Sequence, residues 1–320
     1  MLETTGIHHV TAMTSDAEKI YQFMTDILGL RLAKKTVNQD DIHTYHLFFT
    51  DANGSPGTDL TFFDFPNLRK RSLGKNAIQT IGLRVKNKDA LLYFKTRFEK
   101  SHITHGNIET LFDMTTLPFQ DFDGQHYMLV SDEGLYTDGF TVPWDDTDIP
   151  EDYRILGLGP IEFIVHDLDV MSNVMMNMMQ FRLVTIEGDM ALYETHKGGN
   201  AARVIVKEEK QLPLAIQGFG GVHHVAFRVK DDDALHQWID HLNRIPARHS
   251  GYVDRFYFHS LYTRLHQGIL FEFATDGPGF EDDEEDLENL GTTLALPPKL
   301  RPYRKQIESQ IKPIKTSKVS

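Results

Sequence analysis

The feature that most constrains the fold of this 320-residue chain is a sequence unit that recurs four times. Residues 222–230 read VHHVAFRVK, and residues 78–86 read IQTIGLRVK. Residues 7–13 (IHHVTAM) match in the same register, and residues 158–165 (LGPIEFIV) are a weaker copy. Successive copies start 64 to 80 residues apart, which is too long for a solenoid repeat and fits a small module of strands with one helix.

Each copy has the same predicted order of elements, βαβββ. An alternating apolar strand comes first, an Asp or Ser cap follows, then a helix and three short strands. The helix is predicted at 17–28 in the first copy and 234–242 in the fourth; the three strands are predicted at 30–38, 44–50 and 58–65 in the first copy, and at 247–250, 256–263 and 268–274 in the fourth. One mixed sheet with one helix cannot cover both of its faces, so we expect an α+β fold in which modules pair into two cup-like half-open barrels.

The modules divide the chain into segments. A stretch rich in Pro and Asp separates the second copy from the third. The predicted division is a first pair of modules in 1–141 (about 6–66 and 77–131), a linker in 142–157, a second pair in 158–280 (about 158–208 and 220–276), and an acidic segment with a C-terminal tail in 281–320. The six acids at 281–286 and the basic tail predict a solvated surface, with the tail folded back on the acids as the alternative.

Composition excludes several classes of function. The 33 Lys and Arg against 46 Asp and Glu give a net charge of −13, which disfavours nucleic acid as a partner. No apolar run is long enough to span a membrane, and the N-terminal residues lack the pattern of a secretory signal. The chain has no cysteine, which fits a cytoplasmic location, and a homo-oligomer is compatible with the sequence. Any transition-metal site must therefore use histidine and carboxylate ligands.

Two histidine pairs stand at equivalent positions of the repeat. They are His8-His9 in the first copy and His223-His224 in the fourth, whereas the other two copies have Gln-Thr and Gly-Pro there. Because successive side chains on a strand face opposite ways, one member of each pair should point into a cup. Either His8 with His223 or His9 with His224 can then share a cavity, provided that the first and fourth modules form one cup and the second and third form the other. The ordinary alternative, which fits a single histidine pair best, is a polar edge of a strand without a metal.

A lone acid provides the third candidate ligand. Glu272 stands within the apolar segment GILFEFA, on the predicted last strand of the fourth copy. An unpaired buried carboxylate is costly, so it requires a cation or a base beside it; a salt-bridged core acid is the ordinary alternative. Two imidazoles and one carboxylate on one face leave coordination positions open, which is the arrangement of non-haem Fe(II) oxygenases. A structural zinc site would be closed by a fourth ligand.

Other residues near these strands are candidates for substrate contact. Tyr262 lies on the strand before Glu272 and could donate a hydrogen bond to substrate or dioxygen; the alternative is an aromatic core position. Arg255 could hold an anionic ring substituent, and the alternative is a surface arginine. Thr11 is two residues beyond His9 and so lies on the same strand face.

The repeated βαβββ unit and three segments resemble the vicinal oxygen chelate superfamily, which includes glyoxalases, bleomycin resistance proteins and extradiol dioxygenases. The segments are GIHHVT at 6–11, GGVHHVAF at 220–227 and LFEFATDGPGF at 270–280. The match is closest to the four-module ring-cleaving dioxygenases of the hydroquinone type, and it covers nearly the whole chain. In that family the first and fourth modules share the metal cup.

The resemblance implies a set of site residues. It assigns the Fe(II) ligands to His9, His224 and Glu272, and so selects the second histidine of each pair. It places His8, Thr11, His223, Arg255 and Tyr262 around the metal as catalytic residues. Mn or Zn is an alternative metal in the purified protein.

The predicted function follows from this resemblance. We expect a non-haem Fe(II)-dependent dioxygenase that uses O2 to cleave the ring of a small hydroquinone- or catechol-type aromatic, in the detoxification of quinones or aromatic compounds. One alternative is a glyoxalase-like metal-dependent isomerase or transferase, although such sites use more carboxylates. The other is a non-catalytic protein that binds a small molecule in the empty cup.

Overall fold

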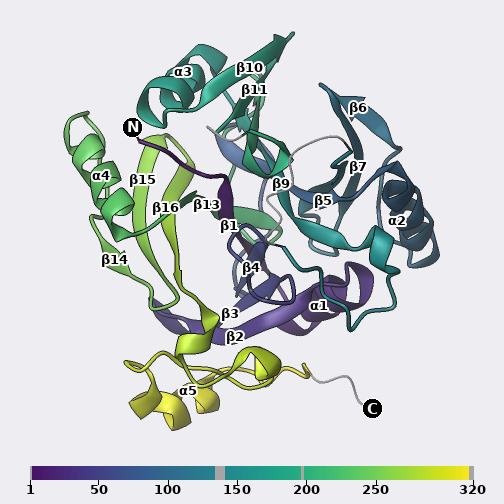
Figure 1. Ribbon diagram of the computed structural model, residues 1–320, viewed down its shortest axis with the longest axis vertical. Helices are drawn as coiled ribbons and strands as arrows, with labels where there is room; N and C mark the ends of the chain where they lie inside the picture. The colour runs from purple at the N-terminus through teal and green to yellow at the C-terminus, as the bar shows by residue number, and fades with distance from the viewer. Residues whose placement is uncertain (1, 134–140, 196–197, 317–320) are drawn as a thin grey trace.

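The computed structural model describes residues 2–133, 141–195 and 198–316 and contains two eight-stranded sheets (Figure 1). The strands of the first sheet are β1 (Ile7–Thr14), β2 (Arg31–Asn38), β3 (Asp41–Thr50), β4 (Asp59–Asp64), β13 (Gly221–Val229), β14 (Val253–Asp254), β15 (Phe258–His266) and β16 (Ile269–Pro278). Those of the second are β5 (Ala77–Val85), β6 (Glu109–Leu111), β7 (Met114–Gln120), β8 (His126–Ser131), β9 (Ile155–Val165), β10 (Arg182–Glu187), β11 (Met190–Glu194) and β12 (Arg203–Glu208).

The strand order shows which repeats share a sheet. It is β14-β15-β16-β13-β1-β4-β3-β2 in the first sheet, which joins the first and fourth repeats, and β10-β11-β12-β9-β5-β8-β7-β6 in the second, which joins the second and third. The two repeats of each sheet meet through their first strands, which pair antiparallel: β1 with β13, and β5 with β9. The predicted fold, with modules one and four in one cup and two and three in the other, is confirmed.

One helix follows the first strand of each repeat. Each begins at an Asp or Asn cap, whose side chain accepts hydrogen bonds from backbone N–H groups of the first turn. The helices are α1 (Ala17–Gln22), α2 (Lys88–Lys100), α3 (Leu168–Asn173), α4 (Asp232–Asn243) and, near the C-terminus, α5 (Arg304–Gln310). π-helical turns at Phe23–Ile27 and Val174–Met178 continue α1 and α3, so the predicted helix at 17–28 is not α-helical throughout. No described helix is both long and apolar enough to cross a membrane.

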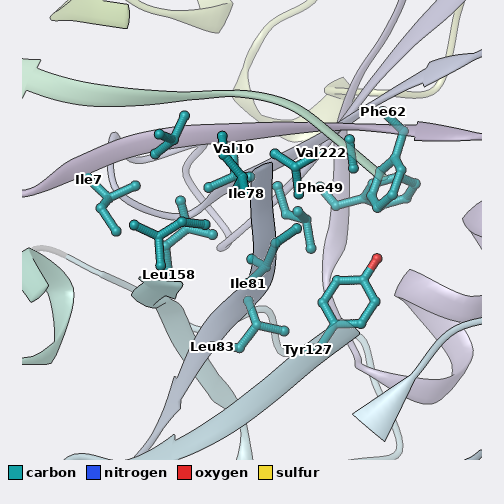
Figure 2. Packing of buried hydrophobic residues seen from close by; sticks show 14 of the residues in the cluster. Ile7, Val10, Phe49, Phe62, Ile78, Ile81, Leu83, Tyr127, Leu158 and Val222 are labelled. Carbon is teal, nitrogen blue, oxygen red and sulfur yellow. The ribbon is translucent and has the colours of Figure 1, made fainter. Parts of the chain in front are cut away.

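A shared hydrophobic core holds the two sheets together. Figure 2 shows Val10 and Val222 of the first sheet packed near Ile78 and Ile81 of the second. These side chains are nearly or completely buried. The first strands of the repeats thus have two structural roles: they join the modules within each sheet, and they line the contact between the sheets.

The strand predicted at 247–250 is wrong. That segment forms a loop with one isolated bridge, His249 to Thr263, and the outermost strand of the sheet is the two-residue β14 at Val253–Asp254. The strand was predicted from the order of elements in the repeat, and a segment of four residues is too short to distinguish an edge strand from a loop that touches the edge at one position.

The acidic segment is a solvated surface only in part: Glu281, Glu284 and Asp286 are exposed as the charge pattern predicted, whereas the side chains of Asp283 and Glu285 are buried. Lys34 of β2 is completely buried, and its Nζ lies 2.9 Å from carboxylate oxygens of both Asp283 and Glu285, whose side chains are 0% and 2% exposed. The alternative prediction is correct for the tail, because Arg304 forms an ion pair with Glu284. The C-terminal segment with α5 therefore packs along β2 and β3 (Figure 1). Residues 317–320 lie outside the described residues, as does the side chain of residue 282.

Candidate metal centre and substrate cavity

A β-bulge on each of two neighbouring strands shapes the centre of the first cup. The antiparallel pairing of β1 and β13 skips one residue on each strand, His8 on β1 and His223 on β13. A bulge breaks the strict alternation of side chains. The Nδ1 atoms of His8 and His9 are therefore 3.0 Å apart, and those of His223 and His224 are 2.8 Å apart. The members of a pair therefore do not face strictly opposite ways, and of the two expected combinations it is His9 with His224 whose ring nitrogens meet.

Three buried donor atoms converge between these strands. The Nε2 atoms of His9 and His224 are 3.1 Å apart, and Oε2 of Glu272 on β16 lies 3.1 Å from the first and 2.9 Å from the second. This is the cluster with metal-ligand spacing in the described part of the chain. The residues come from three adjacent strands, β1, β13 and β16, which the pairing of the first and fourth repeats brings together.

The donor set fits a divalent metal ion. Two donors about 2.1 Å from an ion are about 3 Å apart when they subtend a right angle, and about 3.4 Å apart in a tetrahedral site. The three observed separations match the right-angled case, which is one face of an octahedron. Oε2 of Glu272 is also buried without a well-aligned hydrogen bond from any described residue, so it retains an unused lone pair.

The protonation states suit metal binding. Burial alone would raise the pKa of Glu272, but the imidazoles of His9 and His224 outweigh it and hold the pKa well below its usual value. Burial lowers the pKa of His224, although Glu272 opposes the shift. A carboxylate and a neutral imidazole are the forms that bind a metal, because both have a free lone pair.

Hydroxyl groups surround the three donors. Oγ of Ser260 donates to Oε1 of Glu272 at 2.6 Å, which fixes the carboxylate and leaves Oε2 free. Oγ1 of Thr11 lies 3.0 Å from Nε2 of His224 and 2.8 Å from Oγ1 of Thr61. Thr11 thus lies on the same strand face as His9, as predicted.

Thr61 occupies the position in the first repeat that Glu272 occupies in the fourth. Thr11 and Ala226 each stand two places after the second histidine of their repeat. On the neighbouring strand, Thr11 pairs with Thr61 and Ala226 pairs with Glu272. The first cup therefore has a hydroxyl where a fourth ligand would stand. His46 on β3, 3.0 Å from Thr61, takes the place that Ser260 has beside Glu272.

A cavity of about 320 Å³ opens onto this centre. It has three histidines of the two pairs in its wall, and His46 as well. The remaining wall is mainly aromatic and aliphatic: Val37, Phe48, Phe63, Phe65, Tyr257, Phe258, Tyr262 and Leu270. Such a cavity accommodates a single substituted aromatic ring and offers it few competing polar contacts.

Of the other predicted site residues, some line the cavity and one lies behind it. His223 lines the cavity, and burial, followed by the nearby His224, lowers its pKa to about 3. His8 lies behind His9, with its Nε2 3.0 Å from the carbonyl oxygen of Thr275, so it supports the centre and does not line the cavity. Tyr262 and Arg255 both line the cavity.

Arg255 is held from two sides. Its Nε donates to the hydroxyl of Tyr262 at 3.1 Å, and its Nη1 and Nη2 lie 3.1 and 3.0 Å from the two carboxylate oxygens of Asp40. Burial opposes the charged form, but Tyr262 and Asp40 together raise the pKa of Arg255 above its usual value. Arg255 is therefore a cavity residue and not an ordinary surface arginine.

Four residues of the centre were not predicted from the sequence: Asp40, His46, Thr61 and Ser260. His46 and Ser260 lie on the second short strand of their repeats, Thr61 lies on the third, and Asp40 lies in the turn after the first, and none of them belongs to a motif that stands out in the sequence. Thr61 had a usable signal, since aligning the bulged strands by their histidines places it opposite Glu272.

The chain resembles known proteins along its whole length. Residues 6–126 match the family model of the Glyoxalase/Bleomycin resistance protein/Dioxygenase superfamily. The chain is 43% identical, over 98% of its length and 100% of the relative, to a Bacillus subtilis (strain 168) protein named "Putative ring-cleaving dioxygenase MhqA". The chain belongs to this superfamily. The predicted membership, and the assignment to its ring-cleaving dioxygenases, are confirmed by these relatives.

Two further similarities bear on activity and fold. The chlorohydroquinone/hydroquinone 1,2-dioxygenase of Sphingobium indicum is 28% identical over 94% of each chain. A crystal structure of a "putative dioxygenase" from Bacillus subtilis subsp. subtilis str. 168 covers 100% of both chains with a TM-score of 0.91 and 32% identity. Glyoxalase I from Zea mays has a TM-score of 0.61, with 85% of this chain and 92% of that chain covered, but only 10% identity, so it shares the fold alone.

Proposed function

We propose that this protein is a non-haem Fe(II)-dependent dioxygenase that uses O2 to cleave the ring of a hydroquinone- or catechol-type aromatic, in the detoxification of quinones or aromatic compounds. The observation that carries the proposal is the convergence of His9, His224 and Glu272 within 3.1 Å of one another at an aromatic-lined cavity. The names of the relatives, among them a hydroquinone 1,2-dioxygenase, support the reaction class.

The residues would divide the work as follows. His9, His224 and Glu272 would hold the ion, and because the hydroxyl of Thr61 stands where a fourth ligand would otherwise lie, positions on the ion would remain for substrate and O2. When bound, Fe(II) supplies a Lewis acid and a one-electron redox centre at this position. The phenyl rings of Phe48, Phe63 and Phe258 pack around the substrate ring and exclude water.

Tyr262 is the proposed proton donor to a substrate oxygen. Because its hydroxyl accepts a hydrogen bond from Nε of Arg255, its own proton is available to another acceptor, which is the Ser260 hydroxyl or an oxygen in the cavity. Burial, followed by the charge of Glu272, raises the pKa of Tyr262 above its usual value and keeps the phenol protonated at neutral pH. The proton is thus held at Oη until an oxygen in the cavity becomes basic enough to accept it.

The two alternatives are less well supported. A glyoxalase-like isomerase or transferase would use more carboxylate ligands, whereas the equivalent position here is the hydroxyl of Thr61. A binding protein without chemistry would not need a buried carboxylate directed at two imidazoles, because that arrangement costs stability unless a cation compensates it.

The test is oxygen consumption by metal-loaded protein. Purified protein is loaded anaerobically with Fe(II), Mn(II) or Zn(II) and exposed to O2 with hydroquinone, methylhydroquinone and catechol. We expect O2 uptake with Fe(II), matched by loss of the aromatic absorbance, and none with Zn(II). Folded, iron-loaded protein that consumes no O2 across this panel would contradict the proposal.

Two buried acids provide matched variants. Glu272→Gln should abolish iron retention and O2 uptake. Glu162→Gln removes a mostly buried carboxylate, more exposed than that of Glu272, from the second sheet, where Glu162 accepts a hydrogen bond from Thr80. It should retain both properties, so equal losses in the two variants would point to folding and not to metal binding.

A further inference from the structure

A turn of the first repeat reaches across the mouth of the cavity to the fourth repeat. It connects β2 to β3 and carries Gln39 and Asp40, which both line the cavity. Nε2 of Gln39 donates to the carbonyl oxygen of Arg255 at 2.7 Å, and the carboxylate of Asp40 contacts both terminal nitrogens of the same residue. The turn therefore fixes both the backbone and the side chain of Arg255.

These contacts use three of the five N–H donors of the guanidinium group, one on each of its nitrogens. Nη1 and Nη2 face the two oxygens of Asp40 at 3.1 and 3.0 Å, and Nε faces Tyr262. The guanidinium carbon lies 5.1 Å from the centre of the Tyr262 ring. A two-pronged contact with a carboxylate is the geometry in which arginine binds carboxylate ligands. Asp40 thus occupies the place that a carboxylate on a substrate ring would take.

The contact between Asp40 and Arg255 affects substrate choice because of the charges along the cavity wall. Among the described residues that line the cavity, Arg255 and Asp40 are the ones with an Arg, Lys, Asp or Glu side chain, and their charges cancel. The rest of the wall is histidine, amide, hydroxyl and apolar side chains. A ring with uncharged substituents enters such a cavity without losing an ion pair, whereas a carboxylate can make the two-pronged contact with both Nη atoms of Arg255 only by displacing Asp40.

We propose that Asp40 determines substrate selectivity: by occupying both Nη atoms of Arg255, it makes the cavity favour aromatic rings with uncharged substituents over rings that carry a carboxylate. Asp40 also positions Nε of Arg255 against Tyr262. The inference rests on the proposed function for its choice of aromatic ligands. It assigns Asp40 a role through Arg255 and no direct part in the chemistry.

The test is the equilibrium binding of two ligands to metal-free protein under anaerobic conditions, measured by titration calorimetry. Methylhydroquinone represents the uncharged ring and 2,5-dihydroxybenzoate the carboxylated one. Because the Asp40 side chain is 70% exposed, its ion pair should be worth no more than about 1 kcal/mol, so Asp40→Asn should tighten binding of 2,5-dihydroxybenzoate about fivefold. Binding of methylhydroquinone should change less than about twofold.

Neighbouring variants provide the controls. Asp41→Asn removes the same charge from the next residue, the first of β3, but Asp41 contacts the backbone of His43 and the hydroxyl of Thr44 and not Arg255. It should leave the binding ratio of the two ligands unchanged, and Asp40→Glu should restore it. Adding Arg255→Gln to Asp40→Asn should remove the gain.

The outcomes separate this inference from the proposed function. It is overturned if Asp40→Asn binds 2,5-dihydroxybenzoate no more tightly than the unaltered protein or Asp41→Asn does, or if no variant binds either ligand. A shift in the binding ratio supports it even if the iron-loaded protein consumes no O2, because neither iron nor O2 takes part in the measurement.

Discussion

Lys34→Met is the substitution whose effect on stability follows most directly from the structure. The Lys34 ammonium is fully buried between the carboxylates of Asp283 and Glu285, and it lies 5.6 Å from the centre of the Tyr257 ring. Tyr257 in turn donates its hydroxyl proton to Asp283 at 2.8 Å and lines the substrate cavity. Methionine fills a similar volume but leaves two buried carboxylates without their cation.

The expected loss is large. Removing one partner of a buried ion pair costs about 3 to 5 kcal/mol, because the remaining charge stays buried without compensation. Stability of a folded domain is about 5 to 15 kcal/mol in total, so the loss is a substantial share of it. Part of the loss should be recovered when Asp283→Asn and Glu285→Gln are added, since the orphaned charges are then removed.

Lys35→Met is the control, because Lys35 is the adjacent lysine and its Nζ contacts the hydroxyl of Thr316. Urea denaturation of both variants gives the free energies of unfolding, and limited proteolysis reports whether the segment after Phe280 has detached. We expect Lys35→Met to lose less than about 1 kcal/mol. If Lys34→Met loses no more than Lys35→Met, the reasoning that the acidic segment is fixed by buried charge is refuted.

Three further predictions follow from single contacts. Ser260→Ala removes the hydrogen bond that orients Glu272 and should weaken metal affinity about 10- to 100-fold in equilibrium dialysis; unchanged affinity would contradict this role. Burial lowers the pKa of His126 to about 4, so its contribution to stability is complete above pH 6.5 and is lost as the pH falls from 6.5 to 4; His126→Gln should reduce the loss of unfolding free energy over that range by up to about 2 kcal/mol, after discounting for the half-exposed ring, and parallel pH profiles of the two proteins would refute it. Gly291 has a φ of +77°, and a Cβ there would lie 1.9 Å from the carbonyl oxygen of Leu32, so Gly291→Ala should cost more than about 2 kcal/mol in urea denaturation; a neutral effect would contradict it.

The fold could be predicted from the repeat because all four copies carry the same order of strand, cap and helix. An apolar strand, an Asp or Asn cap and a helix recur four times, and each copy specifies the same module. The histidine pairs in the first and fourth copies also indicated which modules share a cup. The edge strand was mispredicted because an edge position has few contacts to distinguish it from a loop.

The candidate ligands could be predicted for a related reason. The two histidine pairs and Glu272 are polar residues in apolar strand patterns, and such residues stand out without knowledge of their neighbours. The family resemblance then selected His9 and His224 within the pairs. The residues that position these candidate ligands could not be predicted. The side chains of Ser260, Thr61 and His46 are ordinary for strands, and only the pairing of β3 with β4 and of β15 with β16 gives them a role.

The bulges at His8 and His223 show where a periodicity argument fails. Alternation along a strand holds only while each residue has one partner on the neighbouring strand, and the sequence does not reveal where a strand pair will skip a residue. Strict alternation therefore does not describe the two histidine pairs, although their matched register, which allowed His9 to meet His224, is right.

The sequence by itself determined the module, its fourfold recurrence and the residue types that can bind a metal, because these depend on local patterns that each segment carries alone. The tertiary structure decided how far apart the donor atoms lie, that Asp40 cancels the charge of Arg255, and that Lys34 is buried against the acidic segment. Each of these contacts joins residues more than 200 positions apart in the chain. Such contacts are set by sheet pairing and packing, and no local pattern records which distant side chain will be the partner.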